Sequence, residues 1–311
     1  MNHLTAADLE RLVPVRDAIG LLEEALRAGL DPEETPARPG VDFPAGQLLM
    51  MPAVAGAYLG LKAVTIAPAN PGRGLPRIQG TYLLFSADTM TPLATLDGIA
   101  LTSLRTPAVS ALAVSHLAEP DARHLVVFGS GPQAWGHILA LREVRPLDRV
   151  TVVGRDPERA EALAGRARAL GLTAAAGTAD AVAEADLVAC CTTAREPLFA
   201  GSAVRDGATV VAVGSHEPDA RELDGDLVAR ARVVVEARAA ALAEAGDVII
   251  PIRHGTIATG HLAGNLAELV TGKVAIGAGP RVFKSTGMAW EDLVVAAAAY
   301  EAWRAAERVG S

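Results

Sequence analysis

Residues 124–134 read HLVVFGSGPQA, and this stretch decides the fold. Its first part, His124–Phe128, is an apolar run with the length of one buried strand. The turn from Gly129 to Ala134 follows at once and leads into a predicted helix over 133–144. A glycine turn between a buried strand and a helix directs backbone N–H groups and the positive helix end toward a pyrophosphate. The stretch therefore predicts a Rossmann turn that binds a dinucleotide.

Three small residues of this turn have expected roles. Gly129 allows the tight turn, Gly131 lets the phosphates approach the backbone, and Ala134 lets the helix pack closely on the strand. A Gly-x-Gly-x-x-Ala pattern on its own is common in ordinary turns, so the flanking strand and helix are what make it informative.

The alternation of strand and helix continues beyond the turn. A second strand is predicted at Arg149–Val153 and a second amphipathic helix at 156–170, and further apolar runs stand at 187–191, 209–213 and Arg232–Val235. Short apolar strands that alternate with helices are typical of a parallel, doubly wound sheet. We therefore expect an α/β fold with a Rossmann dinucleotide-binding domain over residues 118–288.

The chain before this domain has a different pattern. A helix is expected within the first 30 residues, and short apolar runs punctuated by Pro and Gly follow at 47–51, 59–66, 81–85 and 92–96. Such runs predict the strands of an antiparallel or mixed sheet. Helices are expected at 101–117 and 290–308. We expect residues 1–117 and 289–311 to form a second, α+β domain.

Composition excludes several functional classes. The net charge of −8 over 311 residues argues against a nucleic-acid surface, because neutralising phosphates needs clustered Lys and Arg. No apolar run approaches the roughly 18–20 residues of a membrane span, and the first residues lack the pattern of a secretory signal. The two cysteines, Cys190 and Cys191, are adjacent, which suits neither a disulfide framework nor a metal site. We expect a cytoplasmic enzyme with no metal and no nucleic-acid or membrane partner.

Lysine is rare in this chain. Of 28 basic residues, three are lysines, Lys62, Lys273 and Lys284. A genome biased toward Arg codons explains the scarcity, and under such a bias a retained lysine hints that an ammonium group is needed.

The end of the second strand bears on the choice of cofactor. Gly154 and Arg155 follow it, where an NAD-selective domain normally places a carboxylate for the ribose hydroxyls and where an Arg attracts a 2′-phosphate instead. Asp156 complicates this interpretation, but it precedes Pro157 and can equally be the N-cap of the next helix. We expect NADPH as the cofactor, with NADH as the alternative.

Several short motifs together resemble one family. They are Gly60-Leu61-Lys62, Leu96-Asp97-Gly98, LTSLRTPA at 101–108, the glycine turn, VGSHEP at 213–218 with REL at 221–223, and VFKSTG at 282–287 with Glu291-Asp292. With these motifs the sequence resembles the ornithine cyclodeaminase/mu-crystallin family over essentially its whole length. That family includes cyclodeaminases, ketimine and cyclic imine reductases, alanine dehydrogenases and enzymes that make opine-like or siderophore precursors. The resemblance therefore implies a nicotinamide cofactor more firmly than a particular reaction.

The resemblance also implies roles for individual residues. Arg38 and Lys62 would face the substrate carboxylate and the reacting centre, and Arg105 would lie between substrate and cofactor. The implied cofactor-binding residues are Pro132 and Gln133 at the pyrophosphate, Thr192 on the adenine side, and Val213, Gly214, Ser215 and Thr286 at the nicotinamide. From the residues alone, Arg38, Lys62 and Arg105 are also compatible with ordinary surface positions. The resemblance further implies a homodimer made through the sheet of the N-terminal domain, which would also bind the substrate.

His216 departs from the cyclodeaminase pattern. Cyclodeaminases carry an Asp at the matching position, and that Asp acts on the amino group. An imidazole can relay a proton to a nascent amine, but it cannot supply the fixed negative charge of a carboxylate. We therefore regard His216 either as a catalytic residue or as a loop residue with no chemical part.

These observations favour an NAD(P)H-dependent reductase of a small imine or keto acid. A cyclic ketimine of the Δ1-pyrroline- or Δ1-piperideine-2-carboxylate type is the leading substrate, with a small imino, keto or amino acid as the partner molecule. Two alternatives remain open at this point: an NAD-dependent ornithine or lysine cyclodeaminase, and a non-catalytic NADPH-binding protein like the crystallin branch.

Overall fold

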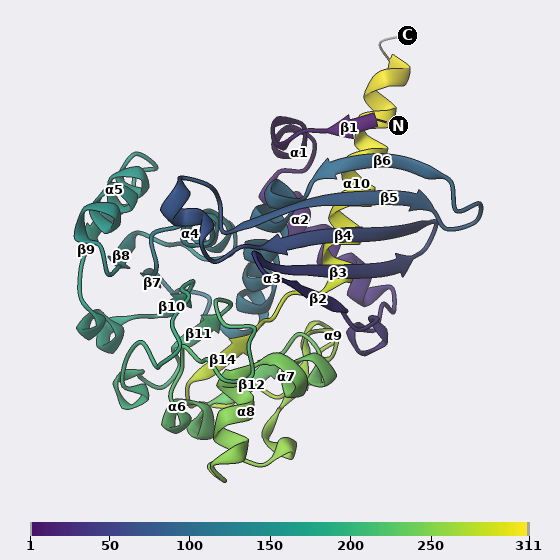
Figure 1. Ribbon diagram of the computed structural model, residues 1–311. Helices are drawn as coiled ribbons and strands as arrows, with labels where there is room; N and C mark the ends of the chain where they lie inside the picture. Colours follow the sequence, from purple (N-terminus) through teal and green to yellow (C-terminus); the bar gives the residue numbers. More distant parts are fainter. Residues whose placement is uncertain (1, 310–311) are drawn as a thin grey trace. The chain divides into compact units, whose positions relative to one another are not determined.

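The computed structural model describes residues 2–309, and these residues divide into two compact units. Unit 1 comprises the chain up to Thr106 together with the chain from Met288 onward, and unit 2 comprises Pro107–Gly287. The division falls inside the helix α3 (Gly98–Leu117), whereas the boundary expected from the sequence stood at the end of that helix. Figure 1 shows the helices and strands of both units.

Unit 2 contains a parallel eight-stranded sheet within the described residues, in the order β13-β12-β14-β11-β10-β7-β8-β9. Its strands are β7 (His124–Phe128), β8 (Arg149–Val153), β9 (Thr173–Ala176), β10 (Leu187–Cys190), β11 (Thr209–Ala212), β12 (Arg232–Val235), β13 (Gly264–Asn265) and β14 (Arg281–Lys284). All seven neighbouring pairs are parallel. The predicted doubly wound α/β fold is therefore confirmed.

Helices connect these strands, as expected for parallel strands. They are α4 (Pro132–Val144), α5 (Pro157–Arg168), α6 (Gly225–Arg230), α7 (Arg238–Glu244), α8 (Gly246–Arg253) and α9 (Leu266–Val270), with short 3-10 turns η3 (Ala179–Glu184), η4 (Gly201–Ala203) and η5 (Thr259–His261). The core is built from apolar side chains of the strands and of the helices that cover them, with Val126, Val188, Val210 and Val282 on four adjacent strands. Parallel strands buried on both faces explain the continuous apolar runs of the sequence.

Unit 1 contains a mixed six-stranded sheet in its described part, in the order β1-β6-β5-β4-β3-β2. The strands are β1 (Asn2–Leu4), β2 (Gly40–Phe43), β3 (Gly46–Ala55), β4 (Tyr58–Ile66), β5 (Ile78–Ser86) and β6 (Pro92–Asp97). Strand β1 runs parallel to β6, and the other pairs are antiparallel. The four apolar runs expected as strands lie within β3 to β6.

Helices cover one face of this sheet. The single helix expected near the N-terminus is in fact two, α1 (Ala6–Leu12) and α2 (Val15–Arg27), because Pro14 lacks the N–H that a continuous helix needs. Two 3-10 turns follow, η1 (Pro32–Glu34) and η2 (Asn70–Arg73). The last helix, α10 (Ala289–Val309), packs on α2, β3 and β4, as shown in yellow in Figure 1.

The two faces of the sheet of unit 1 differ in chemistry, because successive strand residues point to opposite sides. On β4, Gly60, Lys62 and Val64 are buried, whereas Leu59 and Leu61 of the opposite face are partly exposed. We call that opposite face the outer face, and its apolar residues on β3, β4 and β5 are Met50, Pro52, Val54, Leu59, Leu61, Ala63, Leu83 and Phe85. Val54 is 63% exposed. Within residues 2–309, no helix combines the length and apolar character needed to cross a membrane.

Candidate active site

Lys62 lies on the covered face of β4 and is almost completely buried, with 1% of its surface exposed. Its Nζ is 2.7 Å from Oδ2 of Asp292 and donates a hydrogen bond to Oγ1 of Thr102 at 3.3 Å. Asp292 belongs to the first turn of α10, where a carboxylate is favoured by the positive end of the helix. A buried ammonium is thus paired with a buried carboxylate, as the cost of removing charges from water requires.

Arg105 of α3 enters the same cluster. Its Nη1 donates to Oε2 of Glu291 at 2.7 Å, and its Nε donates to Oδ1 of Asp292 at 3.2 Å. Both carboxylates are completely buried, and Arg105 is 5% exposed. Lys62, Arg105, Glu291 and Asp292 form what we call the buried charge cluster, which contains two cations and two anions.

The surroundings of Lys62 bring its pKa close to neutral pH. Burial and the neighbouring Arg105 lower the pKa of Lys62 from 10.5 to about 8, although Asp292 and Glu291 act in the opposite direction. A lysine with such a pKa can both carry and release a proton near neutral pH.

Tyr82 lies opposite Lys62 on the neighbouring strand β5 and is completely buried. A Cβ on Gly60 would overlap the Tyr82 hydroxyl, so this glycine makes room for the ring. Burial and the charge of Asp292 raise the pKa of Tyr82 well above 10, which keeps its phenol neutral.

Arg38 lies apart in sequence from these elements, in the segment between η1 and β2, and its side chain is partly exposed. Of the three substrate-binding residues expected in unit 1, the structure joins Lys62 and Arg105 through a shared partner. Glu291 and Asp292 form part of a sequence motif, but the sequence alone indicates no role for them. Two adjacent acidic residues at the start of an otherwise apolar helix were the available signal.

In unit 2 the glycine turn has the geometry that a pyrophosphate needs. Gly129 has a φ of +108°, and a Cβ there would lie 2.6 Å from the carbonyl oxygen of Cys191. Gly131 is the N-cap of α4, where no side chain caps the helix and where a Cβ would meet only open space. The first N–H groups of α4 therefore remain available to an anion, with Pro132 in the first helical position.

The adjoining Gln133 supports the same fit. Its side-chain oxygen is buried and has no hydrogen-bond partner among the described residues. Native structures leave few buried polar atoms without partners unless a ligand or water satisfies them. The turn and this atom together fit a bound dinucleotide.

The turn after β8 places Arg155 and Asp156 differently. Asp156 is the N-cap of α5, and its carboxylate accepts hydrogen bonds from the backbone N–H groups of Glu158 and Arg159, at 3.0 and 3.2 Å. Its interpretation as an N-cap is thus confirmed. Arg155 is exposed at the carboxyl end of β8, next to the strand that leads into the glycine turn.

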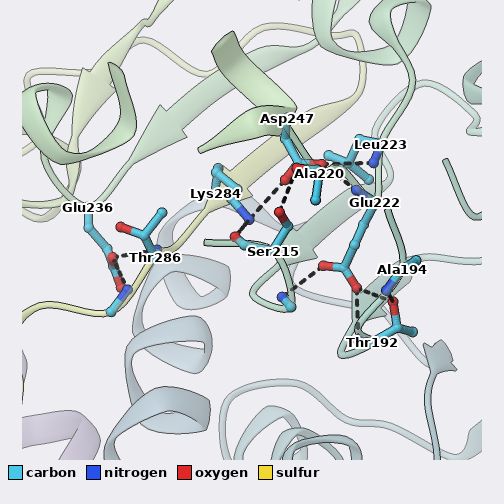
Figure 2. A network of polar contacts seen from close by, with 12 residues as sticks. Thr192, Ala194, Ser215, Ala220, Glu222, Leu223, Glu236, Asp247, Lys284 and Thr286 are labelled. Carbon is cyan, nitrogen blue, oxygen red and sulfur yellow. Dashed lines mark hydrogen bonds and ion pairs between the residues drawn. The ribbon is translucent and has the colours of Figure 1, made fainter. Parts of the chain in front are cut away.

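A buried polar network braces the turns that follow β10 and β11 (Figure 2). Glu222 is completely buried. Its Oε1 accepts from the N–H and the hydroxyl of Thr192, at 2.8 and 2.7 Å, and its Oε2 accepts from the N–H of Gly214 at 2.8 Å. A Cβ on Gly214 would overlap the carbonyl oxygen of Thr192, so these two turns need a glycine to meet. Burial raises the pKa of Glu222.

The network continues to β14, an interior strand of the sheet. Asp247 accepts from the backbone N–H groups of Glu222 and Leu223 through Oδ1, at 2.7 and 2.8 Å, and its Oδ2 is 2.9 Å from Nζ of Lys284. Lys284 also donates to the carbonyl oxygen of Ser215 at 2.6 Å. The turns expected to hold the cofactor are therefore tied together by Glu222 and Asp247, whose roles the sequence did not reveal.

The loop after β14 is held by a carboxylate that directly follows the adjacent strand β12. Glu236 accepts hydrogen bonds from the backbone N–H groups of Thr286 and Gly287, at 2.9 and 2.8 Å. Val213 directly follows β11, and His216, which is partly exposed, follows Ser215 in the same turn. Within residues 2–309, no group of three or more His, Cys, Asp or Glu side chains is placed to hold a metal ion.

Comparisons with known proteins agree with this geometry. The family model described as ornithine cyclodeaminase/mu-crystallin matches residues 2–307. A Δ1-pyrroline-2-carboxylate reductase of Bacillus cereus is 35% identical, over 99% of this chain and 98% of the relative. The solved structure of Thermococcus litoralis Δ1-pyrroline-2-carboxylate reductase in complex with NADH and L-proline has a TM-score of 0.92 at 33% identity, covering 97% of each chain. An archaeal alanine dehydrogenase dimer with bound NAD has a TM-score of 0.93 at 28% identity, covering 99% of this chain and 97% of that chain.

Proposed function

Because this chain belongs to the ornithine cyclodeaminase/mu-crystallin family, we propose that it is an NAD(P)H-dependent reductase of a small cyclic imino acid. The substrate is of the Δ1-pyrroline- or Δ1-piperideine-2-carboxylate type. The observation that carries this proposal is the buried Lys62 beside Arg105, with a pKa of about 8. A cationic pair of this kind fits a substrate that has a carboxylate next to a C=N group. The similarity to reductases named for such a substrate supports the same assignment.

Each cation has a distinct task in this proposal. Arg105 and Arg38 bind the substrate carboxylate, because a guanidinium presents a planar fork that matches two carboxylate oxygens. Lys62 donates a proton to the imine nitrogen, or a hydrogen bond that polarises the C=N bond, as its pKa permits near neutrality. Arg105 also contacts the cofactor. Holding the substrate in one orientation provides much of the rate.

The cofactor is held by unit 2 in this proposal. Gly129, Gly131, Pro132 and Gln133 receive the pyrophosphate at the start of α4, which suits the uncapped helix end. Thr192 contacts the adenine side, and the nicotinamide lies against Val213, Gly214, Ser215 and Thr286. When bound, the reduced nicotinamide supplies the hydride that reduces the imine carbon.

We further propose that NADPH is preferred over NADH. Arg155 is exposed where a 2′-phosphate would lie, and the carboxylate of Asp156 is engaged in capping α5. Solved relatives contain NADH or NAD, so the ratio of kcat/KM for the two cofactors is the direct measurement. A ratio that favours NADH would refute this part of the proposal.

His216 is the second candidate catalytic residue. It follows the turn that Glu222 braces, and its imidazole can relay a proton to the product amine. Replacing His216 with Asn tests this role: a relay predicts a lower kcat with an altered pH profile, whereas unchanged kinetics would remove His216 from the reaction.

The test of the proposed function is a substrate panel. We expect NADPH oxidation with Δ1-pyrroline-2-carboxylate or Δ1-piperideine-2-carboxylate, and loss of turnover in the Lys62→Met variant. Absence of turnover with every imino and keto acid, while calorimetry shows cofactor and ligand binding, would instead identify a binding protein. Formation of proline from ornithine with catalytic amounts of NAD would identify a cyclodeaminase.

The outer face of the sheet in unit 1 leads us to propose a homodimer. Its apolar residues on β3, β4 and β5 are partly exposed, including Val54 and Leu61, and a contiguous apolar patch of this kind marks an interaction site. A second copy of the chain, seated face to face on this sheet, would cover it, and one solved relative is a dimer. We also infer a cytoplasmic location, where reduced nicotinamide cofactors are supplied.

A further inference from the structure

Asp292 contacts both cations of the buried charge cluster. Each of its two oxygens contacts a different cation: Oδ2 lies 2.7 Å from Nζ of Lys62, and Oδ1 accepts from Nε of Arg105 at 3.2 Å. Glu291, the adjacent carboxylate, accepts from Nη1 of Arg105 at 2.7 Å. Asp292 therefore connects Lys62 of strand β4 with Arg105 of helix α3, two residues that are distant in sequence.

The geometry also determines where Lys62 points. An ammonium has three N–H donors, and here one faces Asp292 while another faces Thr102 at 3.3 Å. Among residues 2–309 these two contacts leave one donor for a ligand. A lysine side chain has about 2 kcal/mol of rotamer entropy to lose, so two fixed partners are needed to hold it in one orientation.

We propose that Asp292 is the positioning residue for both substrate-binding cations: it keeps the Lys62 ammonium charged and fixes its spacing from the Arg105 guanidinium. The inference rests on the proposed function only in taking these two cations as the substrate-binding pair. The contacts that support it lie wholly within unit 1.

A proton-linked effect follows from the groups that face Lys62. Arg105 of α3 disfavours its charge, Asp292 and Glu291 of α10 favour it, and Tyr82 of β5 remains neutral. Burial disfavours the charge most strongly. Without the Asp292 carboxylate, burial and Arg105 would be opposed by Glu291 alone among the residues named here, so the pKa of Lys62 would fall below 8.

Because lysine is scarce in this chain, the pKa of Lys62 can be measured by NMR without a substrate. Only three lysines occur in the sequence, so protein labelled with 13C at lysine Cε gives three resonances, and a Lys273→Arg variant helps to assign them. In the Asp292→Asn variant we expect the titration midpoint of Lys62 to fall by about one unit or more. The Glu291→Gln variant is the matched control, and its shift should be smaller because Glu291 favours the charge of Lys62 less strongly.

A second variant keeps the inference testable where Asp292→Asn does not fold. The Arg105→Gln variant lacks the cation that disfavours the charge of Lys62. The titration midpoint of Lys62 should therefore rise above 8 in this variant. An unchanged Lys62 midpoint in Asp292→Asn, or an unchanged or lower one in Arg105→Gln, overturns the inference.

The kinetic readout separates the inference from the proposed function. If the enzyme reduces cyclic imines, Asp292→Asn should lower kcat and move the alkaline limb of its pH profile to lower pH. If no imine is reduced but the Lys62 midpoint moves as expected, the proposed function fails and the positioning role stands.

Discussion

His137 makes the stability of unit 2 sensitive to acid. The imidazole lies in α4, one turn beyond Gln133, and is completely buried. The carbonyl oxygen of Gln133 can only accept, so Nδ1 carries the proton and donates to it at 2.8 Å, and Nε2 accepts from the Ser110 hydroxyl at 2.8 Å. Burial lowers the pKa of His137 from 6.5 to about 4.

The sign and size of the effect follow from this shift. Because the folded pKa is the lower one, the unfolded chain binds the proton more readily, and stability present above pH 6.5 is lost as the pH falls toward 4. At 1.36 kcal/mol for each pKa unit, the difference between the folded and unfolded values is worth roughly 3 kcal/mol in full. About 2 kcal/mol of this is lost between about pH 8 and about pH 5.

Urea unfolding of the wild type and of His137→Gln at these two pH values measures the effect. Glutamine does not titrate, so the loss of stability on acidification should be about 2 kcal/mol smaller in the variant than in the wild type. Equal losses in His137→Gln and the wild type would refute this reasoning.

Four further predictions concern the cofactor site and the outer face. Gly129→Ala should destabilise the fold by roughly 1–3 kcal/mol, measured by thermal unfolding, because its φ is +108° and a Cβ would press on the Cys191 carbonyl. Glu222→Gln should raise the Kd for NADPH by about tenfold, measured by nicotinamide fluorescence, since an amide N–H₂ cannot accept from the donors that Glu222 now satisfies. Arg155→Ala should reduce the preference for NADPH over NADH by about tenfold or more, and an unchanged ratio would exclude Arg155 from the 2′-phosphate site. Leu61→Asp, on the outer face, should yield a monomer in light-scattering measurements, and a dimer that persists would place the interface elsewhere.

The pattern of apolar residues predicted most of both sheets because burial determined it. Strands β7 and β10 are buried on both faces, so their sequences are continuous apolar runs that stand out from the flanking residues. Strand β14 was not predicted as a strand, although it lies inside its sheet between β11 and β12, because Arg281 and Lys284 occupy its ends. Those charges are buried with partners, and such pairing leaves no signal in the local sequence.

In the candidate site, too, the sequence predicted the local motifs but not the contacts between distant residues. Gly129 and Gly131 were predicted from the strand and helix that flank them, since the whole motif is local. The partnership of Lys62 with Asp292 joins residues far apart in the chain, and only the packing of α10 on β4 reveals it. The braces at Glu222 and Asp247 likewise depend on which turns meet at the edge of the sheet.

The last part of the chain completes both units. Strand β14 is inserted between β11 and β12, and α10 covers the sheet of unit 1 (Figure 1). During synthesis on the ribosome, neither unit can close before residues 281–309 have emerged, and until then β11 and β12 have unpaired edges. Translation that stalls before this segment would therefore leave a nascent chain with two incomplete cores, and such a chain depends on chaperones to avoid aggregation.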